Sequence, residues 1–584
     1  MRQSENPAIS GASMYKEIQR LFIHSSLPIA LILMLSLTLN LWGNRWGAPD
    51  YWHPDELTGK AIGMFETRTL IPQTFFYGGL HYYVLEMGAV FPVRVYGKLF
   101  DPIPKESDTA NRSRWAERQQ YRTIWLSRSI SALMATIQVY LTYLIGNLLF
   151  GRTVGVLSSL FLCLSPYFVA ISHFATIDTP SNFWYWLSCF FALMSWKKGD
   201  DAWLWLASVT AGMAIGAKID RIVIIFPLLF SWLKRGEGAR FRRLLKTVPL
   251  IFFGYLLANP AMLLSPIHFL DGTSRDLFFN MGRVDSDAIS PFVQLLSNMK
   301  SGMGWLLFLG AIGGLGVAVQ NLLVDKGRNE VAWLLVSILP YFLLAGTHFS
   351  LPWYVPFFFP PLVIFAAYGC QEMQNIALPV FRMAAKAIPV VIVFSSFLAS
   401  ISMDLQIAKD SRYLAAKWIE QQIPGGASIA VGERGPAISK NKFRLTHLTV
   451  YRAYDDWILV RDWRDRLNQN PSYRFIRKSI LELEEFKATI SGRRGREQPY
   501  KAWFDIVVEK VDAKKKESGT DRDSAVEKAD YLVLVDYLDL ARISELMSPN
   551  SGYRVIKKFQ YRDRFGFQST FPFVNPEVYV FSRS

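Results

Sequence analysis

The chain has 584 residues and a formal net charge of +16, with 51% hydrophobic and only 19% charged residues and a mean hydropathy of +0.17. A soluble protein of this size usually carries about 25% charged residues, so a disordered chain, a coiled coil and a small disulfide scaffold are all disfavoured. The average hides two unlike parts, because residues 405–584 hold 32 of the 64 Lys and Arg residues and 24 of the 48 Asp and Glu residues. The first part has the composition of a membrane protein and the second that of a soluble domain.

Long stretches without Asp, Glu, Lys or Arg dominate the first part. A membrane-spanning helix needs about 20 apolar residues, and ionisable side chains are costly inside the bilayer. The uncharged stretches are 21–44, 129–151, 153–177, 179–196, 202–217, 247–270, 301–324, 331–371 and 387–403. The long stretch 331–371 has room for two spans, and 78–98 and 222–233 are weaker candidates. We therefore predict an α-helical polytopic membrane protein with 11–13 spans and a C-terminal soluble α/β domain.

The predicted order of domains begins with a cytoplasmic segment, residues 1–20, because Lys16 and Arg20 precede the first span. Residues 21–404 form the transmembrane domain, whose first outward loop is 45–77, and residues 405–584 form an extracytoplasmic domain. The topology contains a conflict. Counting 78–98, 122–150 and 153–170 as spans places Asp178 on the cytoplasmic side, whereas the function argued below needs it on the side of Asp55. Either one weak segment does not cross fully or the count of spans is wrong.

Segments of the C-terminal part alternate between helical and strand-like patterns. The sequence predicts a helix at residues 411–422 and strands at 427–431, 504–508, 531–535 and 553–559. A second helix is predicted at 538–547, between the last two strands. This domain contains no catalytic motif, and we interpret it as accessory. The basic charge is divided between both parts of the chain and no nucleic-acid-binding module is present, so no nucleic acid partner is predicted.

Acidic residues provide the first candidates for a site. His53, Asp55 and Glu56 lie in the first outward loop, where a carboxylate can act as a general base on an acceptor hydroxyl. Asp178 is the charged break between two apolar runs, and an ionisable residue at such a depth is by default a functional candidate. Both acids have a plainer alternative, since either one could cap the helix that follows it.

Cations at the ends of spans are the second set of candidates. Arg128, Lys218 and Arg221 could hold a lipid phosphate through charge-assisted hydrogen bonds, or could simply extend to the membrane interface. Asp285 and Asp287 form a short DxD match, which is more typical of a solvated loop. The histidines are too scattered to predict a metal site. No cofactor is therefore expected to be required, and a divalent metal is compatible with the sequence but unsupported by it.

The motifs in this order resemble the GT-C superfamily of polytopic glycosyltransferases, in particular the family 39 type, which includes protein O-mannosyltransferases and aminoarabinose transferases. The acidic motif Trp52-His-Pro-Asp-Glu56 is similar to the first-loop motif of that superfamily. Further similar stretches are Tyr77–Tyr83, Ser127–Leu133, Leu149–Arg152, Leu164–Pro166, His173–Asp178, Gly212–Lys218, Trp353–Pro360 and Asp410–Trp418. The resemblance spans most of residues 30–420.

The resemblance implies an inverting transfer of a hexose or pentose from a polyprenyl-phosphate-linked donor to a glycan, lipid or protein acceptor. The reaction would take place at the outer face of the cell (inner) membrane, among membrane lipids. Asp55 would be the base, with Glu56 and Asp178 as the other catalytic acids. The implied substrate-binding residues are His53, Arg128, His173, Lys218, Arg221 and Tyr354. The chain departs from many relatives at two positions, since Trp353 and His173 replace arginines.

Two other functions stay open at this stage. Charged residues between apolar runs are also typical of a transporter or lipid flippase, although the chain shows no internal repeat. The departures at Trp353 and His173 are also compatible with a non-catalytic scaffold that has kept the GT-C fold.

Overall fold

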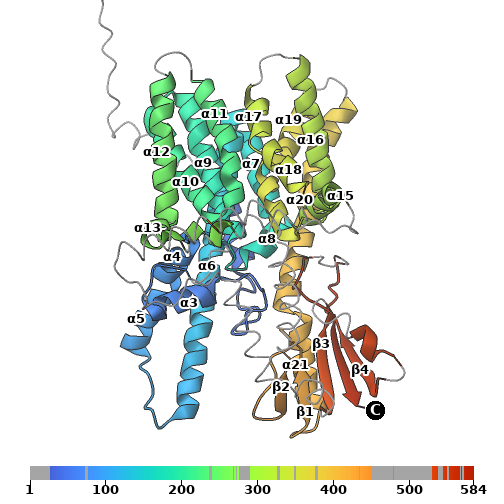
Figure 1. Ribbon diagram of the computed structural model, residues 1–584. Helices are drawn as coiled ribbons and strands as arrows, with labels where there is room; N and C mark the ends of the chain where they lie inside the picture. Colours follow the sequence, from blue (N-terminus) through green and yellow to red (C-terminus); the bar gives the residue numbers. More distant parts are fainter. Residues whose placement is uncertain are drawn as a thin grey trace, which may run out of the picture.

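A computed structural model shows a helical bundle with a small β-sheet domain at one end (Figure 1). The structure describes residues 27–72, 77–235, 240–267, 269–270, 272–274, 290–324, 329–347, 350–374, 379–432, 434–448, 478, 529–536, 543–548, 551–565, 567 and 571–583. The predicted fold class, a polytopic helical protein with a C-terminal α/β domain, is confirmed. The predicted cytoplasmic segment 1–20 and the DxD match at Asp285 and Asp287 lie outside the described residues.

Helices of very different length make up the bundle. They are α2 (Leu27–Leu41), α6 (Thr109–Phe150), α7 (Arg152–Cys163), α8 (Pro166–Ser172), α9 (Asp178–Lys198), α10 (Asp201–Ala217), α11 (Ile225–Leu233), α12 (Arg240–Ala258), α15 (Pro291–Met303), α16 (Trp305–Val324), α17 (Asn329–Val336), α18 (Leu339–Ala345), α19 (Phe359–Gln374) and α20 (Pro379–Ala408). Further helical elements join them. These are α3 (Thr58–Thr67), α4 (Leu80–Leu85), the π-helix η1 (Glu86–Val90), α5 (Phe91–Phe100), α13 (Ala261–Leu264), and the 3₁₀ segments η2 (Ile219–Ile224) and η3 (Pro352–Phe358).

Several helices are long and apolar enough to cross a membrane. In the described part of the chain, four segments pass a test of length and hydropathy, namely 109–150, 305–324, 352–374 and 386–422. A fifth is added if α7 and α8, which meet at a 63° bend, are counted as one broken span. Shorter apolar helices cover 27–41, 245–258 and 329–345. The chain is therefore a multi-pass membrane protein, as predicted.

Small residues allow the bundle helices to approach closely. A Cβ atom added at Gly212 of α10 would lie 2.0 Å from the Ile251 carbonyl oxygen of α12, and one at Gly254 would lie 2.0 Å from that of Val209. Helices in membranes associate largely through such close packing, because lipid tails are as apolar as leucine. These contacts hold α10 against α12 and so set the position of the residue that follows α10, Lys218.

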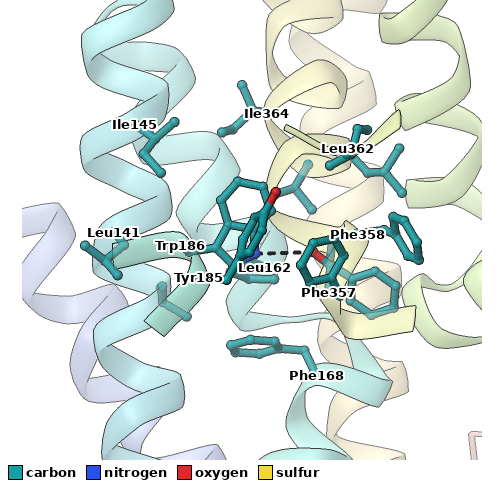
Figure 2. Packing of buried hydrophobic residues seen from close by; sticks show 14 of the residues in the cluster. Leu141, Ile145, Leu162, Phe168, Tyr185, Trp186, Phe357, Phe358, Leu362 and Ile364 are labelled. Carbon is teal, nitrogen blue, oxygen red and sulfur yellow. Dashed lines mark hydrogen bonds between the residues drawn. The ribbon is translucent and has the colours of Figure 1, made fainter. Parts of the chain in front are cut away.

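Aromatic side chains fill the centre of the bundle, where α9 meets η3 and α19 (Figure 2). The indole of Trp186 donates a hydrogen bond of 3.3 Å to the Phe357 carbonyl oxygen, and the ring of Tyr185 lies edge-on to that of Phe357, with 4.7 Å between centroids. Buried indole and phenol groups need such partners because an unpaired polar group is costly in an apolar interior. The packing fixes η3, and with it Trp353 and Tyr354, against α9.

The weak segment 78–98 does not form one helix that runs through the bundle. It folds into α4, η1 and α5, which lie beside α3 at the end of the bundle that carries the β-sheet domain (Figure 1). The Leu57 amide donates a 2.9 Å hydrogen bond to the Ala175 carbonyl, so the first loop and the segment before α9 lie at the same end. The topological conflict is therefore resolved, and Asp55 and Asp178 share one side of the bundle.

The C-terminal domain contains a five-stranded sheet in the order β2-β1-β3-β5-β4. Its strands are β1 (Ser428–Val431), β2 (Arg444–His447), β3 (Tyr531–Val535), β4 (Tyr553–Phe559) and β5 (Val578–Arg583). Strand β1 pairs in parallel with β2 and β3, whereas β5 runs antiparallel to β3 and β4. Buried apolar residues lie on both faces of β3, which is therefore the central strand.

Most of the predicted elements of this domain are found. The helix α21 (Ser411–Gln422) begins and ends as predicted, and three of the predicted strands correspond to β1, β3 and β4. The predicted strand 504–508 lies outside the described residues, as does part of the predicted helix 538–547, of which 543–546 is helical. Strands β2 and β5 were not predicted. Strand β2 is mostly exposed and lacks apolar alternation, whereas β5 carries a clear strand-like pattern, Val-Tyr-Val-Phe.

Candidate functional site

The first loop is anchored to the bundle by a sealed ion pair. The Arg128 guanidinium donates to both carboxylate oxygens of Glu56, at 2.6 and 2.9 Å, and the two side chains are 0% exposed. Arg128 also donates to the carbonyl oxygens of Asn44 and Trp46, at 3.1 and 2.5 Å, and Glu56 accepts from the Ala175 amide at 3.3 Å. The bidentate geometry fits a guanidinium better than an ammonium. This geometry favours a positioning role for both residues over contact with substrate.

Asp55 has the opposite environment, although it is the immediate neighbour of Glu56. Its side chain is half-buried, and its carboxylate has no hydrogen bond or ion pair with any residue that the structure describes. Burial, followed by the negative charge of Asp178, raises the pKa of the Asp55 carboxyl above its ordinary value of 3.8. The cations Lys60, Arg434 and Lys218 act against this shift, so three separate elements place positive charge near Asp55. A carboxylate of this kind is poised to accept a proton.

His53 supports the backbone at Asp55. Its Nδ1 atom accepts a 3.2 Å hydrogen bond from the Asp55 amide, and its ring packs against Phe174 at 4.8 Å and Phe573 at 5.2 Å between centroids. Burial, with the positive charges of Arg434 and Arg128, lowers the pKa of His53 to about 3, so the imidazole is neutral. His53 therefore orients the loop and carries no charge for a phosphate.

The second acid lies at the start of α9 and is paired. Asp178 accepts a 2.9 Å hydrogen bond from the Lys218 ammonium, which also lies 3.8 Å from Asp220 and 4.2 Å from the centroid of the Tyr354 ring. Although burial opposes it, the carboxylates of Asp178 and Asp220 raise the pKa of Lys218, which stays charged. The Lys218 side chain keeps 14% of its surface exposed. The pair thus places a fixed positive charge at the edge of the site.

Arg221 braces this pair from inside the bundle. Its guanidinium is 0% exposed, lies 3.2 Å from Asp220, and donates a 2.9 Å hydrogen bond to the amide oxygen of Asn182. It also lies over the rings of Tyr341 and Phe357, at 4.8 and 4.5 Å from their centroids. Sequence reasoning did not select Asp220, although it lies inside the Lys218–Arg221 motif. Asp220 is the residue that links the two cations.

A close backbone approach brings Tyr77 to the two acids. A Cβ atom at Gly78 would lie 1.5 Å from the Gly216 carbonyl oxygen, so only glycine can pass the end of α10 here. The Gly78 amide donates a 3.1 Å hydrogen bond to the Ala217 carbonyl, directly before Lys218. Burial, together with the charges of Asp55 and Asp178, holds the pKa of the Tyr77 phenol well above its usual value. Tyr77 therefore keeps its proton near both acids.

His173 lies apart from this cluster. Its Nδ1 atom is 2.8 Å from the Val169 carbonyl oxygen and its Nε2 atom is 2.6 Å from that of Trp42, with the Asp404 carboxylate 3.6 Å away. The imidazole is 1% exposed. Both nitrogens are engaged within the protein, so the geometry favours a structural role for His173 over the predicted contact with substrate.

The structure thus divides the predicted site residues into two groups. Asp55, Asp178, Lys218 and Tyr354 come together with Tyr77, whereas Glu56, Arg128, His173 and Arg221 are engaged in contacts inside the protein and His53 supports the loop. Arg434, whose charge acts on Asp55, lies in the C-terminal domain and belongs to no motif that sequence reasoning could have recognised. Among the described residues, no three His, Cys, Asp or Glu side chains cluster in a way that could hold a metal ion.

An acid with a raised pKa, a paired acid and a charged lysine at one end of a polytopic helical bundle are typical of a membrane enzyme that acts at the bilayer surface. Residues 121–270 match the family model described as dolichyl-phosphate-mannose-protein mannosyltransferase. This range includes Asp178 and Lys218 but not Asp55. Comparison with curated proteins finds no match.

Solved structures extend the likeness to the whole fold. The chain is similar to ArnT from Cupriavidus metallidurans in the apo state, with 13% identity, 98% of each chain covered and a TM-score of 0.50. The same ArnT bound to undecaprenyl phosphate is matched with 14% identity, over 94% of this chain and 97% of that one, and a TM-score of 0.49. The Archaeoglobus fulgidus oligosaccharyltransferase in the apo form matches with 14% identity and a TM-score of 0.42, over 68% of this chain.

The match spans only 58% of the length of the archaeal enzyme, whereas it spans nearly the whole of ArnT. At these identities the likeness concerns the fold. The chain has the GT-C fold of polytopic membrane glycosyltransferases, and the resemblance to that superfamily predicted from the sequence is confirmed.

Proposed function

We propose that this protein is a membrane glycosyltransferase that moves a sugar from a polyprenyl-phosphate-type lipid to an acceptor at the outer face of the cell (inner) membrane. The observation that carries the proposal is the Asp55 carboxylate, which is unpaired among the described residues and lies close to the Asp178–Lys218 pair at one end of the bundle. The family model matched by residues 121–270 names a dolichyl-phosphate-linked sugar donor, which supports the class of donor.

In the proposed reaction, Asp55 accepts the proton of the acceptor hydroxyl as its oxygen attacks the anomeric carbon. The bond between that carbon and the phosphate oxygen breaks, and its electron pair passes to the phosphate, so the configuration at the sugar inverts. Lys218 stabilises the negative charge that grows on the phosphate, and Asp178 holds the Lys218 ammonium in place. The lipid tail stays in the bilayer while its head group meets the loop.

The arrangement supports a catalytic role for Asp55 and Asp178 better than a purely structural role. A helix-capping role for Asp55 is not seen, because α3 begins at Thr58 after Leu57 and has no side-chain cap. Burying a carboxylate beside another acid costs stability, and such costs are typical of sites where function requires them. No comparable observation favours a transporter or a non-catalytic scaffold.

The test is whether Asp55→Asn abolishes transfer in cells. Cells that lack the protein should accumulate a polyprenyl-phosphate sugar, measured by mass spectrometry of extracted membrane lipids, and the wild-type protein should remove it. We expect Asp55→Asn to insert normally but to lose about 10²- to 10⁴-fold of the transfer rate, because a positioned base is missing. Asp50→Asn, an exposed acid of the same loop, is the matched control and should restore transfer. Full restoration by Asp55→Asn would refute the proposed base.

A further inference from the structure

A buried arginine is among the residues that join the C-terminal domain to the first loop. Arg412, at the start of α21, donates to both carboxylate oxygens of Asp410 at 2.8 Å, and its guanidinium lies 3.7 Å from the centroid of the Trp52 ring. Trp46 of the first loop donates a 2.9 Å hydrogen bond to Asp410. A guanidinium stacked on an aromatic ring away from water is strongly held. The domain is therefore positioned against the loop that carries Asp55.

The same arginine holds two residues in an unfavourable backbone conformation. Its guanidinium donates to the carbonyl oxygens of Arg434, at 3.4 Å, and Phe573, at 2.7 Å. Arg434 has a φ of 55° and Phe573 a φ of 71°, both in the left-handed region that residues other than glycine rarely adopt. Such conformations persist only where surrounding contacts impose them, and they gather at functional sites. Here the contacts come from Arg412.

With this conformation the Arg434 side chain lies near the candidate site, where its charge acts on Asp55 and His53. Its guanidinium lies 5.9 Å from the centroid of the Phe573 ring, and that ring packs against His53 at 5.2 Å and Trp353 at 5.9 Å. Phe573 thus links Arg434 to His53, whose ring accepts a hydrogen bond from the Asp55 amide. The charges closer to the bundle balance one another, because Lys218 and Arg221 face Asp178 and Asp220. With Asp55 and the nearby Lys60 of α3 included, these charges still sum to zero, so they leave no net positive charge for a phosphate.

We propose that Arg434 is a binding residue for the phosphate group of the lipid donor, supplied to the membrane-embedded site by the C-terminal domain. This inference rests on the function proposed above. A planar guanidinium can contact two phosphate oxygens at once, and its charge does not depend on pH. The C-terminal domain is then part of the site. The contacts of Arg412 with the first loop and with Arg434 hold the phosphate-binding side chain at a fixed position relative to Asp55.

The experiment compares binding of undecaprenyl phosphate and undecaprenol to the full-length protein in lipid nanodiscs, measured by native mass spectrometry. The two lipids share their tail and differ in the phosphate. We expect the wild-type protein to prefer the phosphate, and Arg434→Gln to lose about 10-fold or more of that preference, as the removal of one charge-assisted contact implies. Arg434→Lys should keep part of it. Lys417→Gln, an exposed cation of α21, is the matched control and should change nothing.

The outcomes separate the inference from the function on which it rests. If the wild-type protein shows no preference for the phosphate, the proposed donor class fails and the inference fails with it. If the wild type prefers the phosphate and Arg434→Gln does so equally, only the inference is refuted. If Arg434→Gln weakens the binding of both lipids alike and lowers the thermal midpoint, Arg434 is structural, which also refutes it.

Discussion

Two acids that are neighbours in the sequence, Asp55 and Glu56, have opposite surroundings. Glu56 is sealed with Arg128 and every one of its partners is internal, whereas Asp55 is unpaired among the described residues and faces the partly exposed Lys218. The region of Glu56 and Arg128 and the region of Asp55 and Lys218 consist of the same kinds of residue, acids and cations at the ends of helices. The difference lies in whether the charges are satisfied within the protein. A satisfied pair fixes the position of the backbone, and an unsatisfied carboxylate held by that backbone is available for chemistry.

The sealed pair can be broken by Arg128→Leu, for which we expect the largest effect. The substitution leaves the Glu56 carboxylate and the carbonyl oxygens of Asn44 and Trp46 without their donor, at a cost of about 3–5 kcal/mol. The measurement is the folded yield and thermal midpoint in detergent. Arg94→Leu is the control, because Arg94 pairs with Glu66 on the surface, where an ion pair contributes about 0–1 kcal/mol. Equal stability of the two variants would contradict the structural role of the sealed pair.

Substitutions in the region of Asp55 and Lys218 should change the transfer rate more than the stability. We expect Lys218→Gln to lower the transfer rate per folded molecule by about 10²- to 10³-fold, because a charge that stabilises the leaving phosphate is removed. The rate is measured in membrane vesicles supplied with a polyprenyl-phosphate sugar, and the folded fraction is measured separately. If the variant folds poorly but its folded molecules transfer sugar at the normal rate, Lys218 has a structural role like that of Glu56 and Arg128, and the proposed difference between the two regions is wrong.

The backbone between the two regions can be tested at Gly78. In Gly78→Ala the new methyl group would lie 1.5 Å from the Gly216 carbonyl oxygen, so the chain must shift beside Lys218. Overpacking of this kind costs about 1–3 kcal/mol, and we expect both the thermal midpoint and the transfer rate to fall. Gly313→Ala is the control, because no atom lies within 4 Å of its added Cβ, and it should leave both unchanged.

The smallest expected effect is the contribution of Asp55 to the pH dependence of stability. Because the pKa of Asp55 is raised in the folded protein, the folded state holds the proton more tightly than the unfolded state. Ionisation of Asp55 therefore removes stability as the pH rises from the unfolded value of 3.8 through the higher folded pKa. We expect Asp55→Asn to be more stable than the wild type above this window and equal to it below. The thermal midpoint as a function of pH measures this difference, and a lower midpoint for the variant at neutral pH would contradict it.

Much of the fold was predictable because apolar runs and charges have direct physical meaning in a membrane. The helix 411–422 and three strands of the C-terminal domain follow from hydrophobic period and composition. The path of 78–98 was not predictable. Glu86 and Arg94 interrupt that segment, and only its packing beside α3 shows that it stays at one end of the bundle.

The sequence by itself determined which residues could carry charge at the membrane surface, because an ionisable side chain between apolar runs stands out in any such chain. Only the tertiary structure decided which of those charges neutralise one another. Glu56 with Arg128 and Asp178 with Lys218 pair across stretches far apart in the chain, and Arg434 reaches Asp55 from another domain. Electrostatic energy depends on distance in space and on exclusion of water, and neither quantity is encoded in local spacing.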